Sequence, residues 1–230
     1  DLNNGDLKFS DKWVQRFNRP VQVTARPWIL FDGNIYYSTK TLYESWMIRV
    51  ERLNNGTVVN TTLEMQALVS KVNKEKGREF TISVRRLYES LSLDYLYVDS
   101  EVKIMPGKNL NSDKDLGDID ILLINKKNKQ IVCIEAKNFS ESRTVYELIQ
   151  QNRKIVTKEL SHVIERDVWC KNNINKFKFY VSEIDDEYSV KTIFLTYHEN
   201  AYKYFEHELE NDITFLSAVE IVENPMILFA

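Results

Sequence analysis

Hydrophobic positions along the chain follow two periods, one typical of helices and one typical of strands. Apolar residues recur at three- and four-residue intervals through 63–91 and 144–163, which predicts two long helices, the first broken at Gly77. Strands are predicted at 95–104, 118–125, 130–137, 177–181, 190–197 and 213–216. Shorter helices are expected at 201–209 and after Ser217, which forms a capping box with Glu220. This order predicts an α/β fold of mixed α+β character, with a mixed central sheet flanked by helices.

The first 60 residues have a pattern of their own. Segments 21–24 and 28–31 are extended, and Asp32-Gly33 followed by 35–37 predicts a β-hairpin. A capping box of Thr41 and Glu44 predicts a helix that ends at Asn55-Gly56. The aromatic residues of this part are expected to form its core, and they are Trp28, Tyr36, Tyr37 and Trp46. The alternative is that they form a platform on which the bases of single-stranded nucleic acid stack. We therefore expect a small α+β extension at 1–60 and the main domain at 61–230.

Composition limits the classes of function. The chain has 31 Lys and Arg against 34 Asp and Glu, a net charge of −3, so nucleic acid would have to bind to local basic faces. Only two cysteines are present, which excludes a disulfide scaffold or a Cys-rich zinc module. The absence of a long apolar run and of a signal segment predicts a cytoplasmic protein without a membrane partner. Because the chain starts at Asp1 rather than Met, we expect a fragment of a longer protein with further domains.

The chemically informative stretch is the predicted hairpin around the polar turn 126–129. If the turn is centred between its second and third residues, the numbers of paired residues sum to 255. That register sets Asp120 opposite Glu135 and Asp118 opposite Lys137. The hairpin therefore gathers acidic residues and one lysine at the end of two strands that are otherwise apolar.

Two opposed carboxylates in this place are unfavourable without a partner. Side chains that face each other across a ladder have Cβ atoms about 4.5–5.5 Å apart, and like charges there destabilise the pair. Strand alternation also puts Lys137 on the same face as Glu135. A divalent cation between the carboxylates would remove the conflict, and hard oxygen ligands suit Mg²⁺ or Mn²⁺. The alternative is a solvated hairpin that carries ordinary surface charges.

At these residues the sequence resembles the PD-(D/E)xK nuclease superfamily, whose core is the restriction-endonuclease-like fold. The signature is Asp120 followed fifteen positions later by Glu135-Ala136-Lys137 on a hydrophobic strand. The forms Gly-Asp-Ile-Asp and Glu-Ala-Lys-Asn are most similar to the nuclease-related-domain and archaeal-resolvase-like branches. The segment from Gly77 to Phe80 resembles the acidic helix that precedes the motif. The resemblance extends from Lys74 to the C-terminus, and it departs from the family pattern in lacking a proline before the Asp.

The resemblance implies a role for each matched residue. Asp120 and Glu135 would ligate the metal, and the carbonyl of Ala136 would be a further ligand. Lys137 would position or deprotonate the attacking water and hold negative charge in the transition state. Glu79 would reach the metal directly or through water.

Further residues are expected to contact the substrate. Gln150 or Gln151 would match the polar residue that many family members place on the helix after the motif, and Lys154 lies on the polar face of that helix. Asp118 is the alternative to Asp120, but the register favours Asp120 for the metal and leaves Asp118 as a partner of Lys137.

These features predict a divalent-metal-dependent nuclease that cleaves DNA with Mg²⁺ or Mn²⁺, within a larger bacterial defence or DNA-repair protein. RNA is an alternative substrate, since the phosphate chemistry does not depend on the sugar. The competing hypothesis is a module that keeps the nuclease fold and binds nucleic acid or protein without turnover. A homodimer is compatible with the resemblance, because many relatives dimerise to cut both strands.

Overall fold

The computed structural model describes residues 28–54, 56, 62–139, 142, 145–199 and 212–229, with only the backbone for 145–147. The chain divides into two compact units. The first comprises Asp1–Glu75 and Ser142–Leu148, and the second comprises Lys76–Glu141 and Ile149–Ala230. The boundary expected at residue 60 therefore lies inside the first unit.

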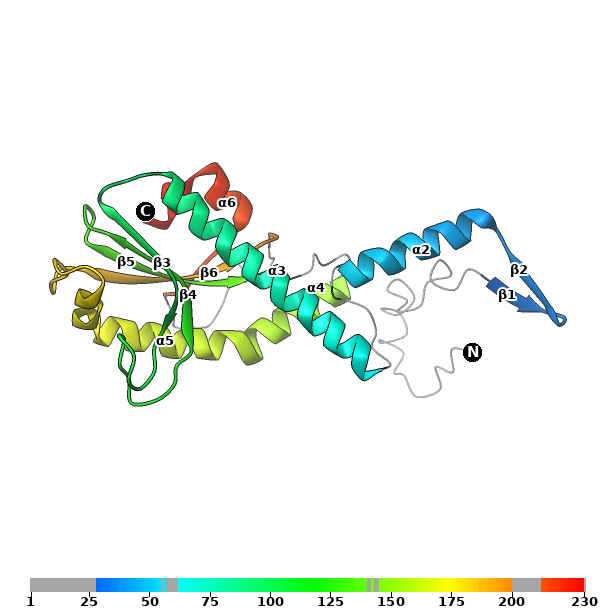
Figure 1. Cartoon of the computed structure of the whole chain (residues 1–230), viewed down its shortest axis with the longest axis horizontal. Helices are drawn as coiled ribbons and strands as arrows, with labels where there is room; N and C mark the ends of the chain where they lie inside the picture. The colour runs from blue at the N-terminus through cyan, green and yellow to red at the C-terminus, as the bar shows by residue number, and fades with distance from the viewer. Residues whose placement is uncertain are drawn as a thin grey trace. The chain divides into compact units, whose positions relative to one another are not determined.

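The first unit contains the predicted hairpin. Strands β1 (Trp28–Phe31) and β2 (Asn34–Tyr37) pair antiparallel around Asp32 and Gly33, whose φ angles of 48° and 71° suit a two-residue hairpin turn (Figure 1). Helix α2 (Thr39–Asn54) follows. Its first turn is capped by Ser38, whose Oγ accepts a hydrogen bond from the backbone N–H of Thr41 at 3.1 Å. The predicted cap at Thr41 is therefore wrong by three residues.

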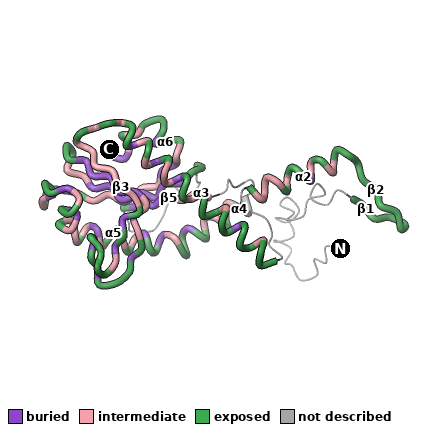
Figure 2. The backbone as a smooth tube through the Cα atoms, viewed as in Figure 1, coloured by how far each residue is buried: buried purple, intermediate pink, exposed green. Residues whose placement is uncertain are grey.

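The aromatic residues of this unit do not form a core. All eight residues of β1 and β2 are exposed, and Trp46 on α2 is 64% exposed (Figure 2). A two-stranded hairpin has too few layers to bury both of its faces. The expected aromatic core is therefore wrong, and the segment 21–24 lies outside the described residues.

Helix α3 (Leu63–Ser90) is continuous, so the break predicted at Gly77 does not occur. A single glycine costs a helix only about 1 kcal/mol relative to alanine, and tertiary packing outweighs that cost. After Gly77 the helix buries Phe80, Val84 and Tyr88 in the second unit.

The second unit is built on a five-stranded mixed sheet, as predicted (Figure 1). Strands β3 (Leu96–Lys103), β4 (Asp118–Asn125) and β5 (Gln130–Lys137) are antiparallel neighbours. Strands β6 (Ser189–Thr196) and β7 (Thr214–Ser217) continue the sheet parallel to β5, in the order β3-β4-β5-β6-β7.

The remaining elements connect and flank these strands. They are α4 (Val145–Lys154), a π-helical turn (Ile155–Glu159), α5 (Leu160–Asn172), a 3-10 helix (Ile174–Phe179), α6 (Ala218–Glu223) and a second 3-10 helix (Pro225–Phe229). The capping box of Ser217 and Glu220 at α6 is confirmed. The strand predicted at 177–181 is wrong, since Phe177 is buried from within a 3-10 helix. The helix predicted at 201–209 lies outside the described residues.

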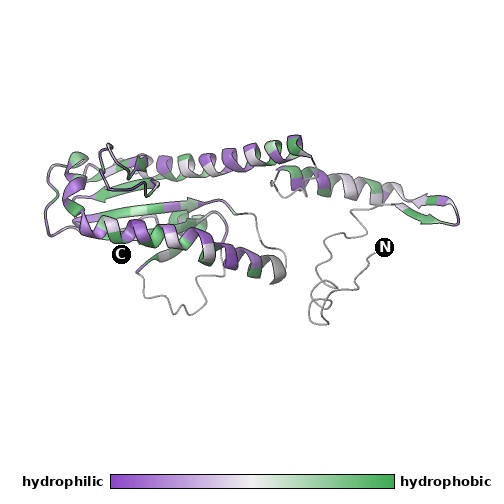
Figure 3. Cartoon of the chain, turned by 90° about the horizontal axis from the view of Figure 1, so that it is seen from below, coloured by the Kyte–Doolittle hydropathy of each residue, from purple (hydrophilic) through white to green (hydrophobic). Residues whose placement is uncertain are grey.

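The sheet is covered on both faces. The part of α3 from Phe80 onward and α6 pack on one face, against Ile121, Leu123 and Ile134. Helix α5 and the first 3-10 helix pack on the other face, against sheet residues such as Leu122. The buried strands are accordingly hydrophobic along most of their length (Figure 3). Among the helices of the described segments, none is long and apolar enough to cross a membrane.

The core assignment predicts a contrast between two Leu→Ala variants. Leu123 is fully buried in the sheet and Leu30 is 75% exposed on the hairpin. We expect Leu123→Ala to lower the free energy of unfolding by about 2–5 kcal/mol, because it leaves a cavity, and Leu30→Ala to change it by less than about 0.5 kcal/mol. Urea unfolding followed by circular dichroism measures both, and equal losses would contradict the assignment.

Candidate functional site

The β4–β5 hairpin has the register that the sequence predicts. Its paired residues run from Asn125 with Gln130 to Ile121 with Ile134, and each pair sums to 255. The Asn125 side chain closes the turn, because its Oδ1 accepts hydrogen bonds from the backbone N–H groups of Lys127 and Asn128. This register holds as far as the pair of Ile121 and Ile134.

The ladder ends one pair before the predicted acidic pair. Asp120 does not pair with Glu135; instead its Oδ2 accepts a hydrogen bond from the backbone N–H of Ala136 at 2.7 Å. Strand alternation is broken at the same point, since Ile119 packs on the α5 side of the sheet and Ile121 packs on the α3 side. The expected face-to-face pairing of Asp120 and Glu135 is therefore absent. The Asp120 carboxylate accepts the hydrogen bond that a main-chain carbonyl of β4 would accept if the ladder continued.

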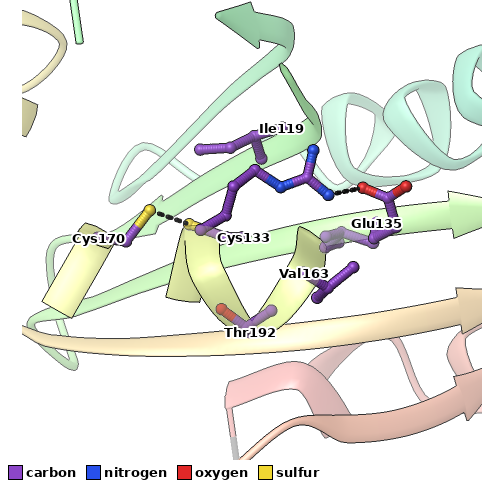
Figure 4. Close-up of a pocket in the computed structure, with 8 residues that line it drawn as sticks. Ile119, Cys133, Glu135, Val163, Cys170 and Thr192 are labelled. Atoms are coloured by element: carbon purple, nitrogen blue, oxygen red, sulfur yellow. Dashed lines mark hydrogen bonds and ion pairs between the residues drawn. The ribbon is translucent and has the colours of Figure 1, made fainter. Parts of the chain in front are cut away.

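Glu135 is nearly buried, and both of its oxygens are in ion pairs. Lys137 Nζ lies 2.6 Å from its Oε1 and 3.3 Å from Oε2 of Glu159. The guanidinium of Arg166 contacts Oε2 of Glu135 through Nη2 and donates to the backbone carbonyl of Asp118 through Nη1. Figure 4 shows the carboxylate of Glu135, with a dashed line that marks this contact with the guanidinium. Lys137 therefore pairs with two glutamates, and its expected pairing with Asp118 is absent.

A π-helical turn brings Glu159 to this cluster. The sequence predicted one uninterrupted helix over 144–163, but its apolar residues Ile149 and Val156 are about half exposed. The π-helical turn Ile155–Glu159 is wound more loosely than an α-helix, so that the buried positions are Ile155 and then Leu160, five residues later. Such turns shift the face that a helix presents and are frequent at functional sites. Here the turn ends at the glutamate that pairs with Lys137.

The cluster perturbs the acid and the base that the sequence singled out. Burial, followed by the negative charge of Glu135, raises the pKa of Asp120 to about 7, against the opposing effects of the Ala136 N–H and the Lys137 charge. Burial acts to lower the pKa of Lys137, but the carboxylates of Glu135, Glu159 and Asp120 outweigh it and raise that pKa. Lys137 is therefore a cation at neutral pH. Perturbed groups gathered in this way mark a candidate functional site.

The donor atoms at this end of the hairpin fit a hard divalent cation. The backbone carbonyl of Lys137 accepts from the N–H of Tyr197 on the β6 side, so alternation turns the carbonyl of Ala136 toward β4 and Asp120. Among the described residues no group of three or more His, Cys, Asp or Glu side chains could hold a metal. Mg²⁺ is commonly bound by one or two carboxylates with water, and the oxygen atoms that could take part here are those of Asp120, Glu135 and the Ala136 carbonyl.

The two cysteines belong to the core beside the site. Their Sγ atoms are 4.0 Å apart, at a cavity of about 10 Å³ that Thr192, Glu135 and Arg166 also line. This volume is roughly that of one water molecule. The hydrogen bond shared with Cys133, followed by burial, raises the pKa of the Cys170 thiol, so it stays protonated. These thiols are packing residues, in agreement with their apolar sequence context.

The side chains of the other predicted site residues are not among those that form the hydrogen bonds and ion pairs of the cluster. Glu79 is exposed on α3, and no hydrogen bond or ion pair in the described part of the chain joins its side chain to Asp120 or Lys137. On α4, Gln150 is exposed and Gln151 is half-buried.

Lys154 lies closer to the strand that carries the motif. Its Nζ is 5.4 Å from the centre of the Phe139 ring, two residues beyond Lys137, and its own side chain is exposed. Asp118 contributes its backbone carbonyl to Arg166.

Sequence reasoning missed Arg166 and Glu159. Both lie on the helical segment after the motif, seven residues apart, which is a spacing that places side chains on one face of a helix. An acid and a base at that spacing, next to a strand with unpaired charges, were the available signal. The helix predicted over 144–163 was continuous, so it gave no reason to single out Glu159, and it ended before Arg166.

The comparisons with known proteins identify no relative: no family model, no curated protein and no solved structure matches the chain.

The raised pKa of Asp120 predicts how stability depends on pH. Its pKa of about 7 in the folded chain exceeds the ordinary value of 3.8, so the folded state binds more protons and loses stability as pH rises from about 4 to about 7. Asp120→Asn removes this loss and keeps an acceptor for the Ala136 N–H. We expect the variant to be more stable than the parent by up to about 4 kcal/mol at pH 8 and by less than about 2 kcal/mol at pH 5.

Urea unfolding in the presence of chelator measures this difference. Asp94→Asn, at an exposed position, is the matched control and should follow the parent at both pH values. A parent-to-variant difference that is the same at pH 5 and pH 8 would show that Asp120 ionises normally.

Proposed function

We propose that this chain is a divalent-metal-dependent nuclease with a restriction-endonuclease-like core, which hydrolyses phosphodiester bonds in DNA. One observation carries the proposal. Where the β4–β5 ladder ends, Asp120 lies close enough to Glu135 for the glutamate charge to raise its pKa, and Lys137 lies beside both. An ionised Asp120 has no cation of its own in this buried place, and a divalent ion is a partner that suits carboxylate oxygens.

The order of elements supports the proposed fold. Helix α3 precedes three antiparallel strands, with Asp120 on the second and the Glu-x-Lys motif on the third. A helix and further strands follow. This is the order in which the superfamily arranges its motif.

Each residue then has a physical role. Mg²⁺ or Mn²⁺ would be held by Asp120, Glu135 and the Ala136 carbonyl, with Glu79 reaching it through water. The bound ion would neutralise the phosphate and lower the pKa of an attacking water. Because the carboxylates keep Lys137 protonated, its role is to hold developing negative charge, and it is a poor general base.

The substrate would lie along the helix that follows the motif. Lys154 is exposed and held near the end of β5 by Phe139, which suits contact with a phosphate group. Gln150 and Gln151 lie on the same helix and offer hydrogen bonds to a backbone or base. RNA in place of DNA is an outcome of the same assay.

A second function is favoured by the ion pairs of Glu135. Lys137 and Arg166 already compensate this carboxylate without any metal. A chain that binds nucleic acid or protein without cleaving it would keep this arrangement. It would bind in the presence of chelator, and it would not nick DNA with any metal.

A nuclease assay decides between the two functions. With Mg²⁺ or Mn²⁺ the purified chain should cut DNA, and chelator should abolish cutting. Asp120→Ala, Glu135→Gln and Lys137→Ala should each lower the cleavage rate by at least about 100-fold, because each removes a cation ligand or a charge that stabilises the transition state. Cleavage of labelled DNA on a denaturing gel measures the rate.

The control is Glu165→Gln, which removes an exposed carboxylate on the same helix as Arg166. It should cut at the parental rate. If Lys137→Ala cuts as fast as the parent, the catalytic assignment is wrong. Anisotropy binding that persists with chelator and without cleavage supports the binding module instead.

A further inference from the structure

The ends of β4 and β5 are held together by side chains beyond the last pair of the ladder. Main-chain pairing stops at Ile121 with Ile134, and Asp118–Asp120 continue alongside β3. Two interactions cross this gap: the hydrogen bond from the Ala136 N–H to Asp120, and the guanidinium of Arg166. For Asp120 and Glu135 to bind one cation, as the proposed function requires, their side chains must be held at a fixed separation across this gap.

Arg166 contacts each strand with a different nitrogen. Nη1 donates to the carbonyl of Asp118 on β4, and Nη2 contacts Oε2 of Glu135 on β5. The arginine side chain is 12% exposed, and it is fixed from α5, which packs on the sheet. A guanidinium is planar, and its donors have a rigid geometry, so its position sets the distance between the two groups it binds.

We propose that Arg166 is a positioning residue, which holds Glu135 and the start of β4 so that Asp120 and Glu135 can share one divalent cation. This inference rests on the proposed function. The arginine leaves Oε1 of Glu135 on the side of Lys137, whose charge also acts on Asp120. Groups that orient metal ligands in this way typically change metal affinity by about 10–100-fold when they are removed.

Lys171 provides a comparison on the same helix. It pairs with Asp167 and with Asp212, and it makes no ion pair with Asp120 or Glu135. Removing its charge alters the net charge of the chain and of α5 as much as removing that of Arg166 does. A difference between the two variants therefore reports the position of the arginine and not the general electrostatics.

The first experiment measures Mn²⁺ binding by titration calorimetry for the parent, Arg166→Gln, Arg166→Lys and Lys171→Gln. We expect Arg166→Gln to weaken binding by at least about tenfold. Arg166→Lys keeps the charge but loses the two-pronged geometry, so it should stay weakened, and Lys171→Gln should stay within about twofold of the parent. Parental affinity in Arg166→Gln, or full recovery in Arg166→Lys, would overturn the proposal.

A second measurement needs no metal. If Arg166 holds the strand ends together, the Ala136 amide should exchange its hydrogen at least about tenfold faster in both arginine variants than in the parent or in Lys171→Gln. The amide of Leu123, in the paired part of β4, should keep its parental exchange rate in every variant that folds.

The two measurements separate the inference from the proposed function. If the parent binds no Mn²⁺, the nuclease proposal fails and the exchange of Ala136 alone decides the role of Arg166. Unchanged exchange at Ala136 in both arginine variants would overturn the positioning role, whatever the metal result.

Discussion

The arrangement of the site depends on the hydrogen bond between Asp120 and the backbone N–H of Ala136. It forms where the β4–β5 ladder stops, so a side-chain carboxylate occupies the place of a main-chain carbonyl. The backbone donor of Ala136 is thereby satisfied, but an acidic group is drawn into a largely buried position. The altered packing of Ile119 and the gap between the strands occur at the same point, and Arg166 bridges that gap from α5.

The charges around it are balanced only when Asp120 is protonated. Glu135 and Glu159 are matched by Lys137 and Arg166 through three ion pairs. An ionised Asp120 adds one negative charge that has no cation of its own, and burial makes that charge more unfavourable. Burial, together with this imbalance, raises the pKa of Asp120 to about 7, and the imbalance identifies the charge that an added cation would neutralise.

The sequence predicted the parts of the site that depend on counting residues. The length of the turn fixed the register from Asn125 with Gln130 onward, and the apolar strands predicted a sheet buried on both faces. It could not predict where the ladder would end, because that depends on the competition between Asp120 and a main-chain carbonyl for the Ala136 N–H. The π-helical turn before Glu159 was also invisible, since its sequence continues a helical pattern. The contact of Arg166 depends on how α5 packs on the sheet, which a periodic pattern does not specify.

Asp120 and Arg166 have opposite effects on the stability of this part of the fold. Removing the charge of Asp120 should stabilise the metal-free chain at neutral pH, so its carboxylate is not there to hold the fold together. Arg166, in contrast, bridges two strands that the main chain leaves unpaired, and its loss would leave Glu135 with Lys137 as its remaining cation partner. The buried carboxylate of Asp120 destabilises the metal-free fold, and Arg166 connects β4 and β5 across the gap beside it. A buried carboxylate that lowers stability is expected where its negative charge is needed for function.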